Sequence, residues 1–243
     1  MKKLKIPSDL TTLAYNSIKQ YILEGRLDRE SRLTEALLSN QLGISRSPVR
    51  EALNSLATEG LITIEPRRGA SLRRFSVKEM SDLYELREVL EVFAVQTAEI
   101  TPKLLSTLTK SVERVRELLD AKKQLEYIEE DTRFHGAIAQ ATGNQSLIAV
   151  LENIQNQLWI CRRETYNLSS KTAYEAHSAI VQALQEGDRR AAKTAMGSHI
   201  SYVRRQLLDH VAAQQGSEHP EEGNGSGLVE NGQGRRLALH AHR

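Results

Sequence analysis

The chain has 243 residues, enough for two domains, and its 26% charged and 40% hydrophobic residues are typical of a water-soluble globular protein. It contains neither an apolar run of about 18 residues nor a signal-peptide pattern, which predicts a cytoplasmic protein with no membrane partner. The single cysteine, Cys161, excludes an internal disulfide and fits a reducing compartment. Lys and Arg outnumber Asp and Glu only in residues 1–75, so the excess positive charge lies at the N-terminal end.

The N-terminal part begins with three predicted helices. Apolar spacing places them over residues 10–25, 34–43 and 45–59. Thr34 can cap the second helix, and Gly43 can end it. Two short helices joined by a tight glycine-bearing turn are typical of a helix-turn-helix, in which the second helix of the pair enters the major groove of DNA.

The third predicted helix carries a face of hydrogen-bond donors. Arg46, Arg50 and Asn54 recur at every fourth position, with Ser45 or Ser47 available as a cap and with apolar residues on the opposite face. Such a face fits a nucleic-acid groove. It also fits a merely solvated surface, and this stretch alone gives the two interpretations about equal weight.

A predicted hairpin follows the third helix. Residues 61–64 and 70–73 have the length and composition of two short strands, and the basic turn between them is Pro66-Arg67-Arg68-Gly69. A glycine at the tip would permit close approach to a phosphate backbone or minor groove. After a helix-turn-helix, this hairpin predicts a winged-helix domain. The residues predicted to contact DNA are Ser45, Arg46, Ser47, Arg50, Asn54, Arg67, Arg68 and Gly69.

Residues 10–75 resemble the winged-helix domain of the GntR family of bacterial transcription regulators. The segments that carry the resemblance are LTEALLSNQLGISRSPVREALNSLATEGLI and RRGASL. The resemblance implies that Ser45, Arg46, Ser47 and Arg50 contact operator phosphates and bases, and that Gly69 places the wing tip in the minor groove. In the fatty-acid-responsive branch a further arginine contacts DNA. Ala36 stands at that position here, so the operator of that branch is not carried over.

Residues 76–212 are predicted to form an all-α bundle. Ser76 can cap the first helix, and helical periodicity places six helices near 78–98, 102–121, 124–142, 145–165, 172–186 and 189–212. One predicted break falls at Leu168-Ser169-Ser170. The tail over 213–243 has the composition of a disordered segment. The sequence thus predicts a mainly α chain with a winged domain over 8–75, a helical domain over 76–212 and a tail.

Four residues of the bundle are candidate metal ligands. Asp131 and His135 lie one turn apart on a helix, and His177 and His199 lie on apolar stripes of two further helices. A single inward-facing histidine is more often a hydrogen-bonded core residue than a ligand. Three of them with a carboxylate form a set that suits a divalent cation such as Zn²⁺ or Ni²⁺.

Residues 78–210 resemble the FCD effector domain of the FadR-like branch of the GntR family. The matching segments are DLYELREVLEVFAVQTA, DTRFHGAIAQATGN, EAHSAIVQALQEGD and MGSHISYVRRQLL. The resemblance implies that Asp131, His135, His177 and His199 bind a divalent metal, and that a small carboxylate effector occupies the adjoining cavity near Arg87.

The sequence therefore predicts a ligand-responsive, sequence-specific DNA-binding transcription regulator rather than an enzyme. As a homodimer it would bind a palindromic double-stranded operator and repress until its carboxylate effector binds. Two alternatives remain open at this point. The metal set could activate water in a small-molecule hydrolase, or the histidines could be purely structural in a dimerisation module.

Overall fold

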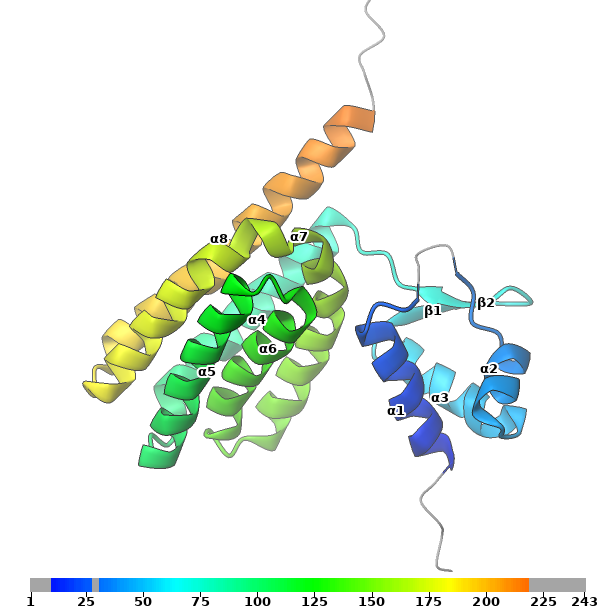
Figure 1. Cartoon of the computed structure of the whole chain (residues 1–243), viewed down its shortest axis with the longest axis horizontal. Helices are drawn as coiled ribbons and strands as arrows, with labels where there is room; N and C mark the ends of the chain where they lie inside the picture. The colour runs from blue at the N-terminus through cyan, green and yellow to red at the C-terminus, as the bar shows by residue number, and fades with distance from the viewer. Residues whose placement is uncertain (1–9, 28–30, 219–243) are drawn as a thin grey trace, which may run out of the picture.

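A computed structural model describes residues 10–27 and 31–218 of the chain (Figure 1). The fold is mainly α, with a three-helix winged domain followed by an all-helical bundle, as the sequence predicts. No helix within the described ranges has both the length and the apolar character needed to span a membrane.

The winged domain contains α1 (Leu10–Leu23), α2 (Glu35–Leu42) and α3 (Arg46–Thr58), followed by β1 (Ile62–Glu65) and β2 (Gly69–Leu72). The predicted ends of α2 are confirmed. The Thr34 hydroxyl accepts a hydrogen bond from the Leu37 amide at 3.1 Å, and Gly43 adopts a left-handed conformation with φ of 66°. Ser45 occupies the N-cap position of α3, but its side chain makes no capping hydrogen bond.

The two strands pair antiparallel, and Leu33 adds a short bridge to the second of them. Its amide donates to the Ala70 carbonyl at 2.7 Å, and the Ala70 amide donates back at 2.8 Å. Gly69 precedes this bridge with φ of 87°, and a Cβ at Gly69 would lie 2.6 Å from the Leu33 carbonyl oxygen. The packing of Leu33 therefore requires glycine here, independently of any approach to DNA.

We expect Gly69→Ala to lower the free energy of unfolding by about 1–3 kcal/mol, because it combines a positive φ with a backbone clash. Urea unfolding followed by circular dichroism measures the change. Gly43→Ala is the matched control, since it has a similar φ of 66° but open space around the added methyl group. An equal loss in the two variants would show that φ alone matters.

The bundle contains α4 (Val77–Thr97), α5 (Pro102–Asp120), α6 (Gln124–Gln140), α7 (Gln145–Gln185) and α8 (Arg189–Glu218). Ser76 and Glu79 form a reciprocal capping box that begins α4, as predicted. Thr101 caps α5 through the Leu104 amide, and Asn144 caps α7 through the Leu147 amide. These local signals fix where the helices begin.

The predicted break at Leu168–Ser170 is wrong, because α7 is one helix of 41 residues. This stretch holds neither glycine nor proline, and buried Ser170 and Ala173 secure it against the rest of the bundle. The helix is nevertheless bent, as Figure 1 shows. Arg162 and His177 both contact Asp131, whereas a straight helix would separate their Cα atoms by about 22 Å. The bend thus returns the second arm of α7 to the bundle core.

The predicted end of the last helix is also too early. α8 continues to Glu218 rather than stopping at 212, because Ala213, Gln214 and Gln215 are good helix formers. The tail predicted over 213–243 overlaps this helix at 213–218, its remainder lies outside the described residues, and its disorder stays a prediction.

A seam of contacts joins the winged domain to α7. The indole Nε1 of Trp159 donates to the Leu23 carbonyl at 2.9 Å, and the Asn153 amide donates to the Glu59 carbonyl at 3.3 Å. Ile160 packs against the core of the winged domain. These contacts all come from one stretch of α7, and Leu23 also packs on the α5–α6 cluster while Arg73 pairs with Glu79 of α4 at 2.7 Å.

Candidate metal centre and nucleic-acid interface

The predicted DNA-contacting residues of α3 share one exposed face. Val49, Ala52, Leu53 and Leu56 are buried on the opposite side, so the amphipathic spacing of the helix fixes its orientation. The exposed face presents Ser45, Arg46, Ser47, Arg50 and Asn54. Side chains and orphan amides at a helix N-terminus can bind phosphates and base edges.

Arg50 is held by an acidic partner that the sequence interpretation missed. Its Nε and Nη2 atoms donate to the two carboxylate oxygens of Glu35 at 2.7 and 2.8 Å. This hydrogen-bonded pair lowers the pKa of Glu35. Glu35 begins α2, next to Ala36, and no local pattern connects it to a residue on α3. The arginine is thus pre-positioned between the two helices of the helix-turn-helix.

The wing presents two exposed arginines at its tip. Arg68 pairs with Glu65 at 3.2 Å, and Arg67 has a positive φ of 65° in the turn that follows Pro66. A non-glycine residue in this conformation is disfavoured by about 1–2 kcal/mol. A glycine would adopt this conformation more easily, so the arginine at position 67 carries local backbone strain.

The four candidate metal ligands lie together in the bundle core. Asp131 and His135 come from α6, His177 from the second arm of α7, and His199 from α8. All four side chains are buried, and one potential ligand atom from each lies within 4.8 Å of the others. The rings of His177 and His199 are nearly perpendicular, with centroids 4.9 Å apart. Inward-facing helical stripes therefore place residues distant in sequence around one point.

Two histidines of this cluster, His177 and His199, are in the neutral form that metal binding requires. Burial lowers the pKa of His177 to about 3 and that of His199 well below its ordinary value. Both imidazoles are therefore neutral at pH 7, as metal ligands must be. Neither ring nitrogen of these two residues has a hydrogen-bond partner within the described part of the chain.

Asp131 is kept ionised by a buried arginine. Burial, the largest single influence, would raise its pKa, but Arg162, His135, His177 and Arg87 together outweigh that effect and hold the pKa well below its usual range. Arg162 contacts the Oδ2 atom, whereas Oδ1 has no hydrogen-bond partner among the described residues and lies 3.5 Å from Nε2 of His177. The free oxygen is therefore the Asp131 atom that faces His177, whereas His135 lies nearer to Oδ2.

His135 is oriented by a carboxylate on α4. Its Nδ1 atom contacts Glu91, which leaves Nε2 directed toward Asp131 at 3.9 Å. Glu91 in turn accepts a hydrogen bond from Nε of Arg87 at 2.6 Å. Burial raises the pKa of Glu91, but Arg87 and His135 together lower it to about 2. A carboxylate behind a ligating histidine is a common arrangement in metal sites.

Arg87, the predicted effector-binding residue, is fully buried beside this cluster. Its Nε atom is occupied by Glu91, whereas Nη1 and Nη2 have no hydrogen-bond partner in the described residues. Two buried donors on a guanidinium match the two oxygens of a carboxylate.

The arrangement fits a divalent cation, because its buried nitrogen and oxygen atoms have no hydrogen-bond partners among the described residues. Ligand atoms bound to a common ion at about 2.0–2.2 Å lie at most about 4.4 Å apart, so the four side chains need only a small inward adjustment from 4.8 Å. A cation would satisfy the buried nitrogens and the free Asp131 oxygen together.

The sequence interpretation missed Glu91 and Arg162, the two charged residues that support the cluster. Both are buried, and each pairs with a residue of the candidate metal set. Glu91 had one usable signal, since it lies one helical turn after Arg87. The Arg162–Asp131 pair joins two helices and has no local signature.

An exposed helix-turn-helix with a wing, joined to a bundle with a buried ligand-binding cluster, defines a class: DNA-binding transcription regulators that respond to a ligand. Comparison with known proteins agrees. The family model described as bacterial regulatory proteins, gntR family, matches residues 10–72, and that of the FCD domain matches residues 82–202.

Two relatives and one solved structure illustrate the similarity. A helix-turn-helix regulator from an unstable DNA locus of Streptomyces ambofaciens is 30% identical over 194 residues, covering 78% of this chain and 81% of that protein. The transcriptional repressor RspR of Escherichia coli K12 is 26% identical over 193 residues, covering 78% and 85%. A GntR regulator from Rhodococcus sp. RHA1 shares the fold with a TM-score of 0.73 at 21% identity, covering 82% and 97%.

The chain belongs to the GntR family of bacterial transcription regulators and carries an FCD domain. Its relatives are regulators rather than enzymes, so the hydrolase alternative is set aside.

Proposed function

We propose that the protein is a repressor whose α3 face and wing contact a palindromic operator as a homodimer. The residues proposed to contact DNA are Ser45, Arg46, Ser47, Arg50, Asn54, Arg67, Arg68 and Gly69. Support comes from the exposure of all of these residues except the half-buried Gly69, and from relatives named as repressors, such as RspR. Two copies related by a two-fold axis would present their α3 helices about 34–36 Å apart, in successive major grooves.

An apolar stripe on α4 supports the homodimer. Leu86, Val89 and Phe93 recur on one side of the helix and are 45%, 66% and 47% exposed. A stripe of this kind is usually covered in an oligomer. The helix begins at the Ser76 capping box, where we place the division between a DNA-binding domain over 8–75 and an effector domain that starts at 76.

The proposed sensor is a divalent metal ion, Zn²⁺ or Ni²⁺, held by Asp131, His135, His177 and His199. Imidazole and carboxylate ligands suit these borderline ions. A bound ion would act as a Lewis acid with an open position for a small carboxylate, and the free Nη groups of Arg87 could bind the same carboxylate. The effector would weaken DNA binding only if its affinity differs between a domain arrangement that binds the operator and one that does not.

The observation that carries this proposal is the presence, in one chain, of an exposed donor face on α3 and a buried Asp/His₃ cluster. The test is operator selection from a random DNA pool, repeated with and without citrate, malate and acetate. A palindromic site that is lost when one of these carboxylates is added is expected. A selected site without two-fold symmetry would contradict the dimer, and a site indifferent to every carboxylate would contradict the effector class.

Arg50→Ala is expected to weaken operator binding about 5- to 150-fold if Arg50 reads a base, with a smaller loss on random DNA. The physical reason is that bidentate hydrogen bonds to a guanine discriminate between bases, whereas a phosphate contact does not. Fluorescence anisotropy with both DNAs measures the ratio. Glu35→Gln is the matched variant, because it removes the negative charge that pairs with Arg50 and keeps the arginine side chain. An equal loss on both DNAs would reassign Arg50 to a phosphate.

A further inference from the structure

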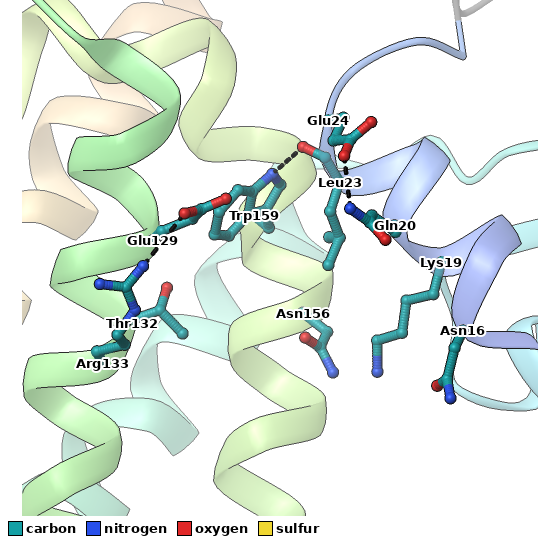
Figure 2. Close-up of a pocket in the computed structure, with 10 residues that line it drawn as sticks. All are labelled: Asn16, Lys19, Gln20, Leu23, Glu24, Glu129, Thr132, Arg133, Asn156 and Trp159. Atoms are coloured by element: carbon teal, nitrogen blue, oxygen red, sulfur yellow. Dashed lines mark hydrogen bonds and ion pairs between the residues drawn. The ribbon is translucent and has the colours of Figure 1, made fainter.

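A groove of about 400 Å³ lies on the seam between the two domains. Its volume falls in the range of clefts that bind small molecules. Figure 2 shows that one wall belongs to α1 of the winged domain and the other to α6 and α7 of the bundle. None of the four candidate metal ligands lines it. The groove is therefore separate from the proposed metal centre.

The charged side chains of the groove are already neutralised by the protein. Lys19 pairs with Glu59 at 3.2 Å and donates to the Tyr15 hydroxyl at 2.8 Å. Arg133 pairs with both Glu129 and Glu130, at 3.2 and 2.5 Å. An anionic ligand would have to displace these carboxylates, so the charge distribution favours a neutral ligand.

Polar groups suited to a neutral ligand remain on both walls. In Figure 2, neither Asn16 of α1 nor Asn156 of α7 forms a hydrogen bond to any other residue drawn. Each amide offers both donors and an acceptor, which matches the dual character of a hydroxyl group. The Thr132 hydroxyl donates to the Ile128 carbonyl at 2.8 Å, so its oxygen can still accept. Trp159 and Leu23 supply the apolar part of the lining.

We propose that this groove is a second ligand site, which binds a neutral, hydroxyl-rich small molecule of monosaccharide or polyol type between Asn16 and Asn156. Because its walls come from two domains, such a ligand would bind one domain arrangement better than another. Operator DNA and the ligand would then alter each other's affinity by the same factor.

The test uses Trp159 as a reporter, because it is the only tryptophan in the chain and lines the groove. The full-length protein is titrated with D-glucose, D-xylose, D-mannitol and myo-inositol while tryptophan emission is recorded. We expect a saturable change with at least one probe, with a Kd of about 1 mM or lower. Asn16→Ala and Asn156→Ala should each weaken that binding about tenfold. Ser17→Ala, an exposed position of α1 that does not line the groove, should leave it unchanged.

Three outcomes would overturn the proposal. These are no saturable response to any of the four probes, an unchanged affinity in both asparagine variants, or saturation by phosphate or citrate alone with loss in Lys19→Ala. The last result would replace the neutral ligand by an anion. Probe binding is measured without DNA or added metal, so its failure is distinguishable from failure of the proposed repressor function.

Discussion

Glu91→Gln is expected to lower the free energy of unfolding of the metal-free protein by about 3–5 kcal/mol at neutral pH. Glu91 is 1% exposed and accepts from Arg87, which is 0% exposed, at 2.6 Å. Glutamine keeps the shape of the side chain but removes its charge. The Arg87 guanidinium would then be buried without its counter-ion, and two of its nitrogens already have no hydrogen-bond partner in the part of the chain that the structure describes.

The effect of this substitution should depend on pH in a defined direction. The pKa of Glu91 is lowered to about 2 in the folded protein, from an ordinary value of 4.5. A depressed carboxyl pKa stabilises the fold above the unfolded pKa, and that contribution is lost as the pH falls through the folded value. The stability difference between the wild type and Glu91→Gln should therefore be constant above about pH 5 and shrink between about pH 4.5 and pH 2.

Urea unfolding after treatment with a chelator measures both effects. Glu85→Gln on the same helix is the matched control, because Glu85 also pairs with an arginine but its side chain is 55% exposed. Its loss should not exceed about 1 kcal/mol. Equal losses in the two variants would contradict a special role for the buried pair.

The predictable parts of the fold are those with local signals. Thr34, Gly43 and Ser76 mark helix ends because caps and left-handed turns need particular residues at single positions. The break predicted at Leu168–Ser170 rested on small polar residues with weak helix propensity, and packing of the bent helix overrides them. Figure 1 shows a bend in α7, but the helix is continuous, so the predicted division into two helices is wrong.

The candidate site was predictable only to the extent that helical periodicity reports on it. Asp131 and His135 are neighbours on one helix face, and apolar stripes direct His177 and His199 inward. The supporting charges were not predictable, because Arg162 of α7 and Glu91 of α4 reach Asp131 and His135 from helices other than α6. The Trp159 contact with Leu23 joins residues 136 positions apart, and no spacing rule encodes it. The metal-binding role of the four residues stays a prediction.

His177→Ala is expected to reduce metal affinity by at least about 100-fold, since removing even an outer partner of a ligand costs about 10- to 100-fold. His177 is neutral at pH 7 because burial lowers its pKa to about 3, so its nitrogen is available without displacing a proton. Its Nε2 atom lies 3.5 Å from the free oxygen of Asp131. Removing the imidazole leaves three ligands, on two helices instead of three.

Two measurements separate lost coordination from lost packing. Elemental analysis after dialysis against Zn²⁺ should give about one ion per wild-type chain and little in the variant. Saturating Zn²⁺ at about 100 times its Kd should stabilise the wild type by about 2.7 kcal/mol and leave His177→Ala unchanged. Phe134→Leu is the packing control, because Phe134 stacks on the His177 ring with centroids 4.0 Å apart but offers no ligand.

The control should lose stability while retaining the metal and the response to Zn²⁺. If the histidines are only structural, the wild type will bind no metal, and the two variants will differ only in their free energies of unfolding. If both His177→Ala and His199→Ala keep the metal, the ion is bound elsewhere in the chain. A metal lost from both histidine variants but kept by Phe134→Leu is the one pattern that only coordination by this cluster explains.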